Sequence, residues 1–265
     1  MDPIAQLKET AKQAWASFAP TEMFSGSTAP RLVKFAQVTP GARVLDVACG
    51  TGVVGLTAAR LGAKVTGLDL SPPLLERAKE NASIMGLEIE WHQGDVEALP
   101  FEDASFDVVL SQFGHMFAPR PKVAIQEMLR VLRRGGTIAF STWPPDVFVG
   151  KMFALTARYL PPPPPGVSPS WEWGDSNIVR ERLGTAVTDL CFDRDAMRVP
   201  ILSPQHVRQF MERIAGPVIK LVEMLQTSDP PKLAAFRREL DELASIYFQD
   251  NWVRQDFLVT RAIKA

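Results

Sequence analysis

The sequence predicts an α/β fold in which helices cover both faces of a mostly parallel sheet. Over residues 43–142, short runs rich in valine, leucine and isoleucine alternate with segments of helical periodicity, an order that is typical of parallel sheets. A glycine-spaced turn directly follows the first of these runs. The chain has 265 residues, of which 46% are hydrophobic, so it can form one large domain with added segments.

Each element of this core has its own local signals. Gly62 is placed to end the helix after the first strand, and Gly86 to end the next. Ser71 and Pro72 suit the N-cap and the first turn of that second helix. A third helix is expected from Pro121 to residue 134, where two glycines end it. The five strands are expected at about 43–48, 64–69, 88–92, 106–111 and 137–142.

Further segments flank this core. Residues 3–18 show amphipathic spacing, which predicts a helix that either packs on the body or forms a lid. Pro161–Pro165 is expected to form a stiff polyproline II spacer, or a ligand for a proline-binding partner. Asp175 is expected to cap a short helix. The remaining elements are expected as a helix at 148–160, a strand or hairpin at 186–201, helices at about 204–225 and 230–248, and a last strand at 253–263.

The stretch VLDVACGTGVVG at residues 44–55 carries the strongest signal for function. Gly50 and Gly52 allow a tight turn and leave room for a ligand, and the following helix begins with free N–H groups. With Gly55 they also fit the dinucleotide fingerprint, with Asp69 downstream to hold a ribose. However, Asp46 would repel a pyrophosphate and attract a cation. The pattern therefore favours a nucleoside with a positively charged tail over a nicotinamide.

Four stretches in the expected order resemble class I S-adenosylmethionine (SAM) methyltransferases of the ubiquinone/menaquinone-biosynthesis type. They are VLDVACGTG at 44–52, VTGLDLS at 65–71, GDVEALPFEDASFDVVLS at 94–111 and EMLRVLRRGGTIAFSTW at 127–143. The resemblance is strong over residues 30–145. It implies a Rossmann-like, doubly wound sheet of seven strands with the last antiparallel, SAM as cofactor and S-adenosylhomocysteine (SAH) as product.

The resemblance also implies roles for individual residues. Asp46 would hold or orient the glycine loop near the ammonium group, Asp69 would accept both ribose hydroxyls, and Asp95 would accept from the adenine amine. Leu70 would pack on the adenine, and the Val96 N–H would donate to a ring nitrogen. The full expected cofactor set is Asp46, Ala48, Cys49, Gly50, Thr51, Gly52, Asp69, Leu70, Gly94, Asp95, Val96, Ser111 and Gln112.

His115 is the histidine nearest the expected chemistry. It is a candidate general base near neutral pH, with local hydrogen bonding or pocket lining as the alternative. Trp143, Trp171 and Trp173 are candidates for stacking on an acceptor or for packing. The stretch after the fourth strand lacks the Asn/Asp-Pro-Pro-Tyr and Pro-Cys signatures, which argues against adenine, glutamine and cytosine as acceptors.

The added segments predict a small, apolar or aromatic acceptor under a helical cap. Their inward faces are apolar at Phe148, Met152, Phe153, Leu155, Phe210, Met211 and Ile214. The expected division is a lid helix at 1–29, a SAM-binding core at 30–145, cap helices with a sixth strand at 146–250, and a last strand at 251–265. A SAM-binding protein without methyl transfer, or a NAD(P)-dependent oxidoreductase, remains the alternative.

Composition limits the other possibilities. The net charge of −1 provides no basic surface for nucleic acid. The two cysteines, Cys49 and Cys191, do not indicate a disulfide framework. No apolar leader or membrane-length apolar window is present, so a cytoplasmic protein without an integral membrane segment is expected. We expect no metal, and the sequence leaves the oligomeric state open.

Overall fold

A computed structural model describes residues 3–265, apart from the side chain of Gln13. One sheet runs through the molecule in the order β3-β2-β1-β4-β5-β8-β6, with β7 paired to β8. Strands β1 to β5 are parallel, and β8 lies antiparallel between β5 and β6. This confirms the predicted fold class; the two-residue β7 is additional. The strands are β1 Arg43–Val47, β2 Lys64–Asp69, β3 Glu90–Gln93, β4 Phe106–Gln112, β5 Leu132–Thr142, β6 Val187–Pro200, β7 Phe248–Gln249 and β8 Trp252–Lys264.

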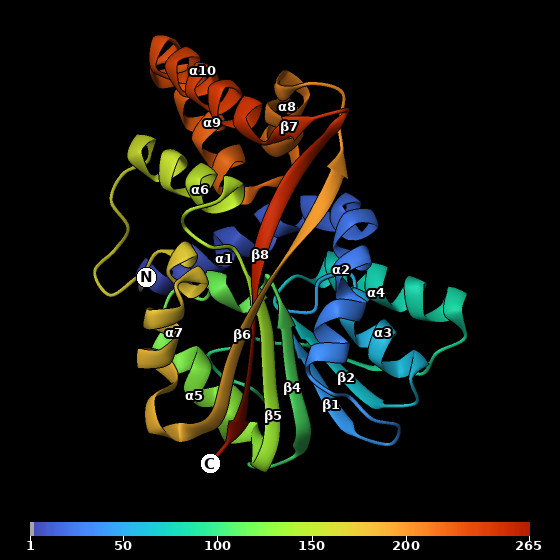
Figure 1. Ribbon diagram of the computed structural model, residues 1–265. Helices are drawn as coiled ribbons and strands as arrows, with labels where there is room; N and C mark the ends of the chain where they lie inside the picture. The colour runs from blue at the N-terminus through green and yellow to red at the C-terminus, as the bar shows by residue number, and fades with distance from the viewer. Residues whose placement is uncertain (1–2) are drawn as a thin grey trace.

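Helices cover both faces of the sheet (Figure 1). One face carries α2 (Glu22–Phe35), α3 (Val53–Arg60) and α4 (Pro72–Met85), and the other carries α5 (Pro121–Val131) and α7 (Ser176–Leu183). Because β1 lies between these layers, four of its five residues are buried, as expected for a central parallel strand.

A second layer of helices, which we call the helical cap, lies beyond one end of the sheet. It consists of α6 (Phe148–Tyr159), α8 (Pro204–Ile214), α9 (Gly216–Ser228) and α10 (Pro230–Tyr247). The long strands β6 and β8 extend from the sheet to the cap (Figure 1). The N-terminal helix α1 (Pro3–Trp15) and the 3-10 turn η1 (Ala16–Thr21) pack against α9 and α8 of the cap. The other 3-10 turns are η2 (His115–Phe117), η3 (Ser170–Gly174) and η4 (Gly184–Ala186).

Two predicted helix boundaries were wrong. The helix expected to reach residue 134 ends at Val131, and β5 begins at once at Leu132. Gly135, with a φ of 67°, lies inside this strand, where the register with β4 shifts, so the glycine pair allows an irregular strand rather than ending a helix. The helix expected at 204–225 is two helices, because Pro217 lies in the first turn of α9, where its missing N–H costs nothing.

The N-terminal region also differs from the prediction. Helix α2 was not predicted, and the expected boundary between residues 29 and 30 falls within it; residues 1 and 2 lie outside the described residues. Ser71 occupies the N-cap position of α4, but its hydroxyl does not cap the helix and instead donates to the Lys12 carbonyl at 3.3 Å. None of the helices described is both long and apolar enough to cross a membrane.

Candidate active site

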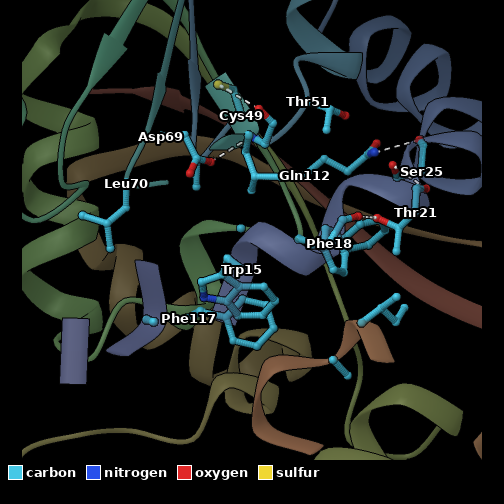
Figure 2. A pocket seen from close by; sticks show the side chains of 18 of the residues that line it. Trp15, Phe18, Thr21, Ser25, Cys49, Thr51, Asp69, Leu70, Gln112 and Phe117 are labelled. Carbon is cyan, nitrogen blue, oxygen red and sulfur yellow. Dashed lines mark hydrogen bonds between the residues drawn. The ribbon is translucent and has the colours of Figure 1, made fainter. Parts of the chain in front are cut away.

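A cavity lies at the carboxyl ends of β1, β2 and β4, below α1 and the helical cap. The carboxyl edge of an open parallel sheet is where such folds bind ligands, at the point where the strand order reverses. Figure 2 shows Asp69 and Leu70 on one side of it, Ser25 and Thr21 on another, and Trp15 beside Phe117. Its polar side is lined by Lys8, Asp46, Ala48, Cys49, Gly50, Thr51, Asp69, Leu70, Gly94, Asp95, Val96 and Gln112.

The glycine loop after β1 is a strained turn that Asp69 holds in place. Ala48, Gly50 and Gly52 all have positive φ, of 52°, 56° and 81°, a conformation that glycine adopts at little cost. The Asp69 carboxylate accepts the Gly50 N–H through Oδ2 and the Ser71 N–H through Oδ1, each at 2.8 Å. Asp69 therefore ties the loops after β1 and β2 together and presents its remaining lone pairs to the cavity.

Asp46 is the most deeply buried acid of the cavity. Its Oδ2 accepts the Gly55 N–H at 2.8 Å, whereas Oδ1 has no hydrogen-bond partner among the described residues. Burial is the main cause that raises the pKa of Asp46 to about 7; the hydrogen bond from the Gly55 N–H opposes this rise, and the nearby Asp69 charge adds to it. Burial also raises the pKa of Asp69. A cationic group in the cavity would favour the ionised form of both acids, so the site is suited to a positively charged ligand.

A third acidic group follows β3. Asp95 accepts the Glu97 N–H through Oδ1 at 2.9 Å and the Lys8 ammonium through Oδ2 at 2.5 Å. The Glu97 side chain is fully buried, and its oxygens accept from Lys8 at 2.5 Å and from Arg120 at 2.6 and 2.7 Å. Both acids are thus paired, and Asp95 also lines the cavity.

The turn after β4 packs tightly against the glycine loop. Phe113 has a φ of 62°, which is uncommon for a bulky residue and is found mainly at functional sites. A side chain at Gly114 would meet the Ala48 carbonyl at 2.6 Å, so glycine is required for this approach. The Phe113 ring stacks on Trp143, with centroids 3.9 Å apart. This turn forms the floor between the polar side of the cavity and the cap side.

The cap side of the cavity is apolar and largely aromatic. Trp15 of α1 contacts Phe117, with ring centroids 4.5 Å apart, and Phe117 contacts Phe153 of α6 at 5.5 Å. The ionisable side chains among the described lining residues belong to Lys8, Asp46, Cys49, Asp69 and Asp95, all on the polar side. The cap side of the lining comprises Trp15, Phe18, Phe24, Phe117, Trp143, Val149, Met152, Phe153, Met197, Val199, Phe210, Met211, Ile214, Ala215 and Gln255.

The structure does not place His115 in this cavity. Its ring is fully buried between Phe140 and Trp173, at centroid distances of 4.6 and 4.7 Å, and neither ring nitrogen has a partner among the described residues. Burial, with a smaller effect of the Arg182 charge, lowers the pKa of His115 to about 3. The imidazole is therefore neutral and out of reach of an acceptor, and we do not retain it as the general base.

Other predicted site residues also lie outside the cavity lining. Ser111 is fully buried, and its hydroxyl accepts the His115 N–H at 3.2 Å. Gly52 and Trp173 are buried behind the lining, and Trp171 is half-buried. Phe148, Met152, Phe153 and Leu155 of α6 all belong to the hydrophobic core, but only Met152 and Phe153 also line the cavity. The other predicted cofactor residues all line the cavity.

Some lining residues were not predicted. Lys8 and Trp15 belong to a helix whose amphipathic pattern gave no sign of which side chains face a ligand. Gln255 and Met197 come from the extensions of β8 and β6 into the cap. The sequence predicts strands here, but the position of their ends beside the cavity is a tertiary feature.

The local geometry agrees with known proteins. The profile described as a methyltransferase domain matches residues 45–140. An uncharacterized protein of Mycobacterium tuberculosis (strain H37Rv) is 36% identical over 259 residues, which is 96% of this chain and 94% of that protein. Demethylmenaquinone methyltransferase of Staphylococcus aureus is 40% identical over 138 residues, covering 50% of this chain and 56% of that enzyme. The chain belongs to the class I SAM-dependent methyltransferases.

Solved structures show the same fold for this methyltransferase. A proposed methyltransferase from Bacillus halodurans superposes with a TM-score of 0.61 at 20% identity, covering 90% of this chain and 99% of that one. A phosphoethanolamine N-methyltransferase of Haemonchus contortus, in complex with phosphomonomethylethanolamine and SAH, has a TM-score of 0.56 at 17% identity, covering 90% and 52%. The cofactor of the family is SAM, and Asp46 Oδ1, which has no partner within residues 3–265, lies beside the glycine loop and fits the cationic end of SAM.

The cavity does not contain a recognisable metal site. Within residues 3–265, no group of three or more His, Cys, Asp or Glu side chains is arranged to hold a metal ion.

Proposed function

We propose that this methyltransferase transfers the methyl group of SAM to a small, apolar or aromatic acceptor bound between α1, η1 and the helical cap. The observation that carries the proposal is the division of the cavity into two unlike halves. One half holds all of the ionisable side chains described for the cavity, and the other is built, apart from Gln255, of aromatic, aliphatic and methionine side chains. Two unlike ligands can therefore meet at the floor formed by Phe113 and Gly114.

The residues of the polar half would hold SAM along its length. Asp46 and the glycine loop would hold the amino-acid end, Asp69 the ribose hydroxyls and Asp95 the adenine amine, with Leu70 against the adenine face. Each of these groups lines the cavity. Gln112 lies beside them at the end of β4, where its amide donates to the Ser25 carbonyl at 2.8 Å.

The chemistry would be an in-line displacement. A lone pair of the acceptor forms a bond to the methyl carbon while the carbon–sulfur bond breaks and its electrons stay on sulfur. Because the methyl group is already activated, the protein mainly has to position the acceptor and exclude water. The apolar half offers no ionisable side chain among its described residues, so no protein base is assigned, and a proton of the acceptor would pass to solvent when the products leave the cavity.

A methyl-transfer assay tests this proposal. Labelled SAM is offered with phenolic, quinol, fatty and nucleic-acid acceptors, and we expect label in apolar small molecules. Label only in RNA, DNA or protein would refute the small-molecule acceptor. Tight SAM binding without turnover on any acceptor would favour the alternative of a SAM-binding protein that has lost its chemistry.

Cofactor binding is expected to release a proton from Asp46. In the ligand-free protein the pKa of Asp46 is about 7, and a neighbouring ammonium group lowers it, so binding shifts the acid to its ionised form. Affinity for SAH should then rise with pH, by up to roughly tenfold per unit below pH 7, and level off above it. Calorimetric titration at pH 6 in buffers of different ionisation enthalpy measures the released proton. Equal proton release by wild type and Asp46→Asn would contradict the assignment.

The apolar half is expected to determine acceptor affinity. Phe153→Ala removes a ring that contacts Phe117 in the cavity, and should raise the acceptor KM roughly tenfold or more while SAM affinity stays unchanged. Tyr159→Phe on the same helix is the control, because Tyr159 bonds Glu239 instead of lining the cavity. If Phe153→Ala leaves KM as it is, α6 contributes packing alone. Phe148 is unsuitable for this test because it belongs to the core.

A further inference from the structure

Helix α1 is attached to the same loops that would hold the cofactor. Lys8 bonds Asp95 after β3, the Lys12 carbonyl accepts from Ser71 after β2, and Trp15 contacts Phe117 after β4. The same helix lines the acceptor half of the cavity with Trp15. A change in the position of these loops therefore acts directly on a wall of the acceptor site.

Lys8 forms side-chain ion pairs that join α1 to the body of the protein. Its Nζ lies 2.5 Å from Asp95 Oδ2 and 2.5 Å from Glu97 Oε2, and its side chain is 16% exposed. Glu97 is fully buried and is shared with Arg120. Because the ammonium group neutralises a buried carboxylate, this contact is harder to break than a surface ion pair.

The contact also determines how Asp95 faces the cavity. Asp95 Oδ1 is held by the Glu97 N–H and Oδ2 by Lys8, so the plane of the carboxylate is set from two sides. Each oxygen retains a further lone pair, and the side chain is 28% exposed along the cavity. Lys8 and the Glu97 N–H thus orient the unbonded edge of the Asp95 carboxylate, and neither of them needs to contact the nucleobase.

We propose that Lys8 is a positioning residue that aims Asp95 at the nucleobase and fastens α1 over the cavity, so that nucleotide recognition and closure of the acceptor site are coupled. This inference rests on the proposed role of Asp95 in adenine binding. It assigns a functional role to a residue of α1, outside the four stretches that identify the family.

Two ligands distinguish a role of Lys8 in orienting Asp95 from a role in the stability of the protein. SAH has an amine at position 6 of its base, whereas S-inosylhomocysteine has a carbonyl, which a carboxylate disfavours. Lys8→Met should weaken SAH binding roughly tenfold and should reduce the preference for SAH over S-inosylhomocysteine by a similar factor. A purely structural role would weaken both ligands equally and leave the preference unchanged, which would overturn the proposal.

Lys12→Met is the matched control. Lys12 is also on α1, but its side chain pairs with Glu9 of the same helix, so its loss should leave both dissociation constants at the wild-type values. Hydrogen exchange provides a second readout. SAH should slow exchange of the amides of α1 in wild type and Lys12→Met, and should do so much less in Lys8→Met.

Folding of the variants is checked by circular dichroism. If Lys8→Met does not fold, Lys8→Gln keeps a hydrogen-bond donor for Glu97 and serves in its place, with the same expected loss of preference. Wild-type selectivity and α1 protection in the folded variant would overturn the role of Lys8 alone. Failure of the wild-type protein to bind SAH at all would instead refute the proposed function.

Discussion

Asp69→Ala is expected to weaken SAM binding about 5- to 150-fold, the loss of about 1–3 kcal/mol that follows removal of a buried hydrogen-bonding group. The ribose hydroxyls would lose their acceptor, and the Gly50 N–H would lose the carboxylate that positions the glycine loop. Because Gly50 and Ser71 both donate to Asp69, the ligand-free variant should also be less stable.

The measurements are calorimetric titration with SAM and thermal unfolding without ligand. Asp107→Ala is the control, because Asp107 accepts the Arg43 N–H at the opposite end of the sheet and also pairs with Arg133. It should lower stability and leave SAM affinity intact. If Asp69→Ala bound SAM as wild type does, or if the protein preferred NADH, the cofactor assignment would be wrong.

His115→Leu is expected to remove a large part of the acid sensitivity of the fold. In the folded protein the pKa of His115 is about 3, against about 6.5 in the unfolded chain. The neutral ring therefore supports the fold above pH 6.5, and this contribution falls as the pH drops towards 3, by about 1.4 kcal/mol per unit. The difference in unfolding free energy between variant and wild type should shift in favour of the variant over this range.

Urea titrations from pH 7.5 to 4.5 measure this difference. The raised pKa of Asp46 acts with the opposite sign, since stability from that acid falls as pH rises towards 7, but it is common to both proteins and cancels. Met116→Leu, a neighbouring buried substitution, should keep the wild-type slope. Turnover of His115→Leu at pH 7.5 should stay within a few-fold of wild type, whereas a loss of about 100-fold or more would restore the general-base role.

Most of the core could be predicted because its signals are local. Strand β2 was predicted at its observed bounds, and the left-handed Gly86 ends α4 as expected. The predicted end of the third helix was wrong because the local sequence there is compatible with two structures. Gly135 and Gly136 suit both a helix end and an irregular strand, and the packing of β5 against β4 decides between them.

The clustering of the acids proposed to hold the cofactor was also predictable, because they follow consecutive strands. Asp46, Asp69 and Asp95 stand at the ends of parallel strands or just beyond them, and such ends meet at one edge of the sheet. The acceptor half was predicted in part. Helix periodicity cannot distinguish Phe153, which lines the cavity, from Phe148, which lies in the core, because both are apolar residues of one buried helix.

The sequence by itself therefore determined the fold class, the cofactor and the acids that line the cavity, since these depend on short motifs and on the order of strands. The tertiary structure alone decided which other side chains line the cavity. It turned His115 away from the cavity into a packed aromatic cluster, and it brought Lys8 from the N-terminus to Asp95 and Glu97. Both outcomes depend on how segments far apart in the chain pack together, which a local pattern does not encode.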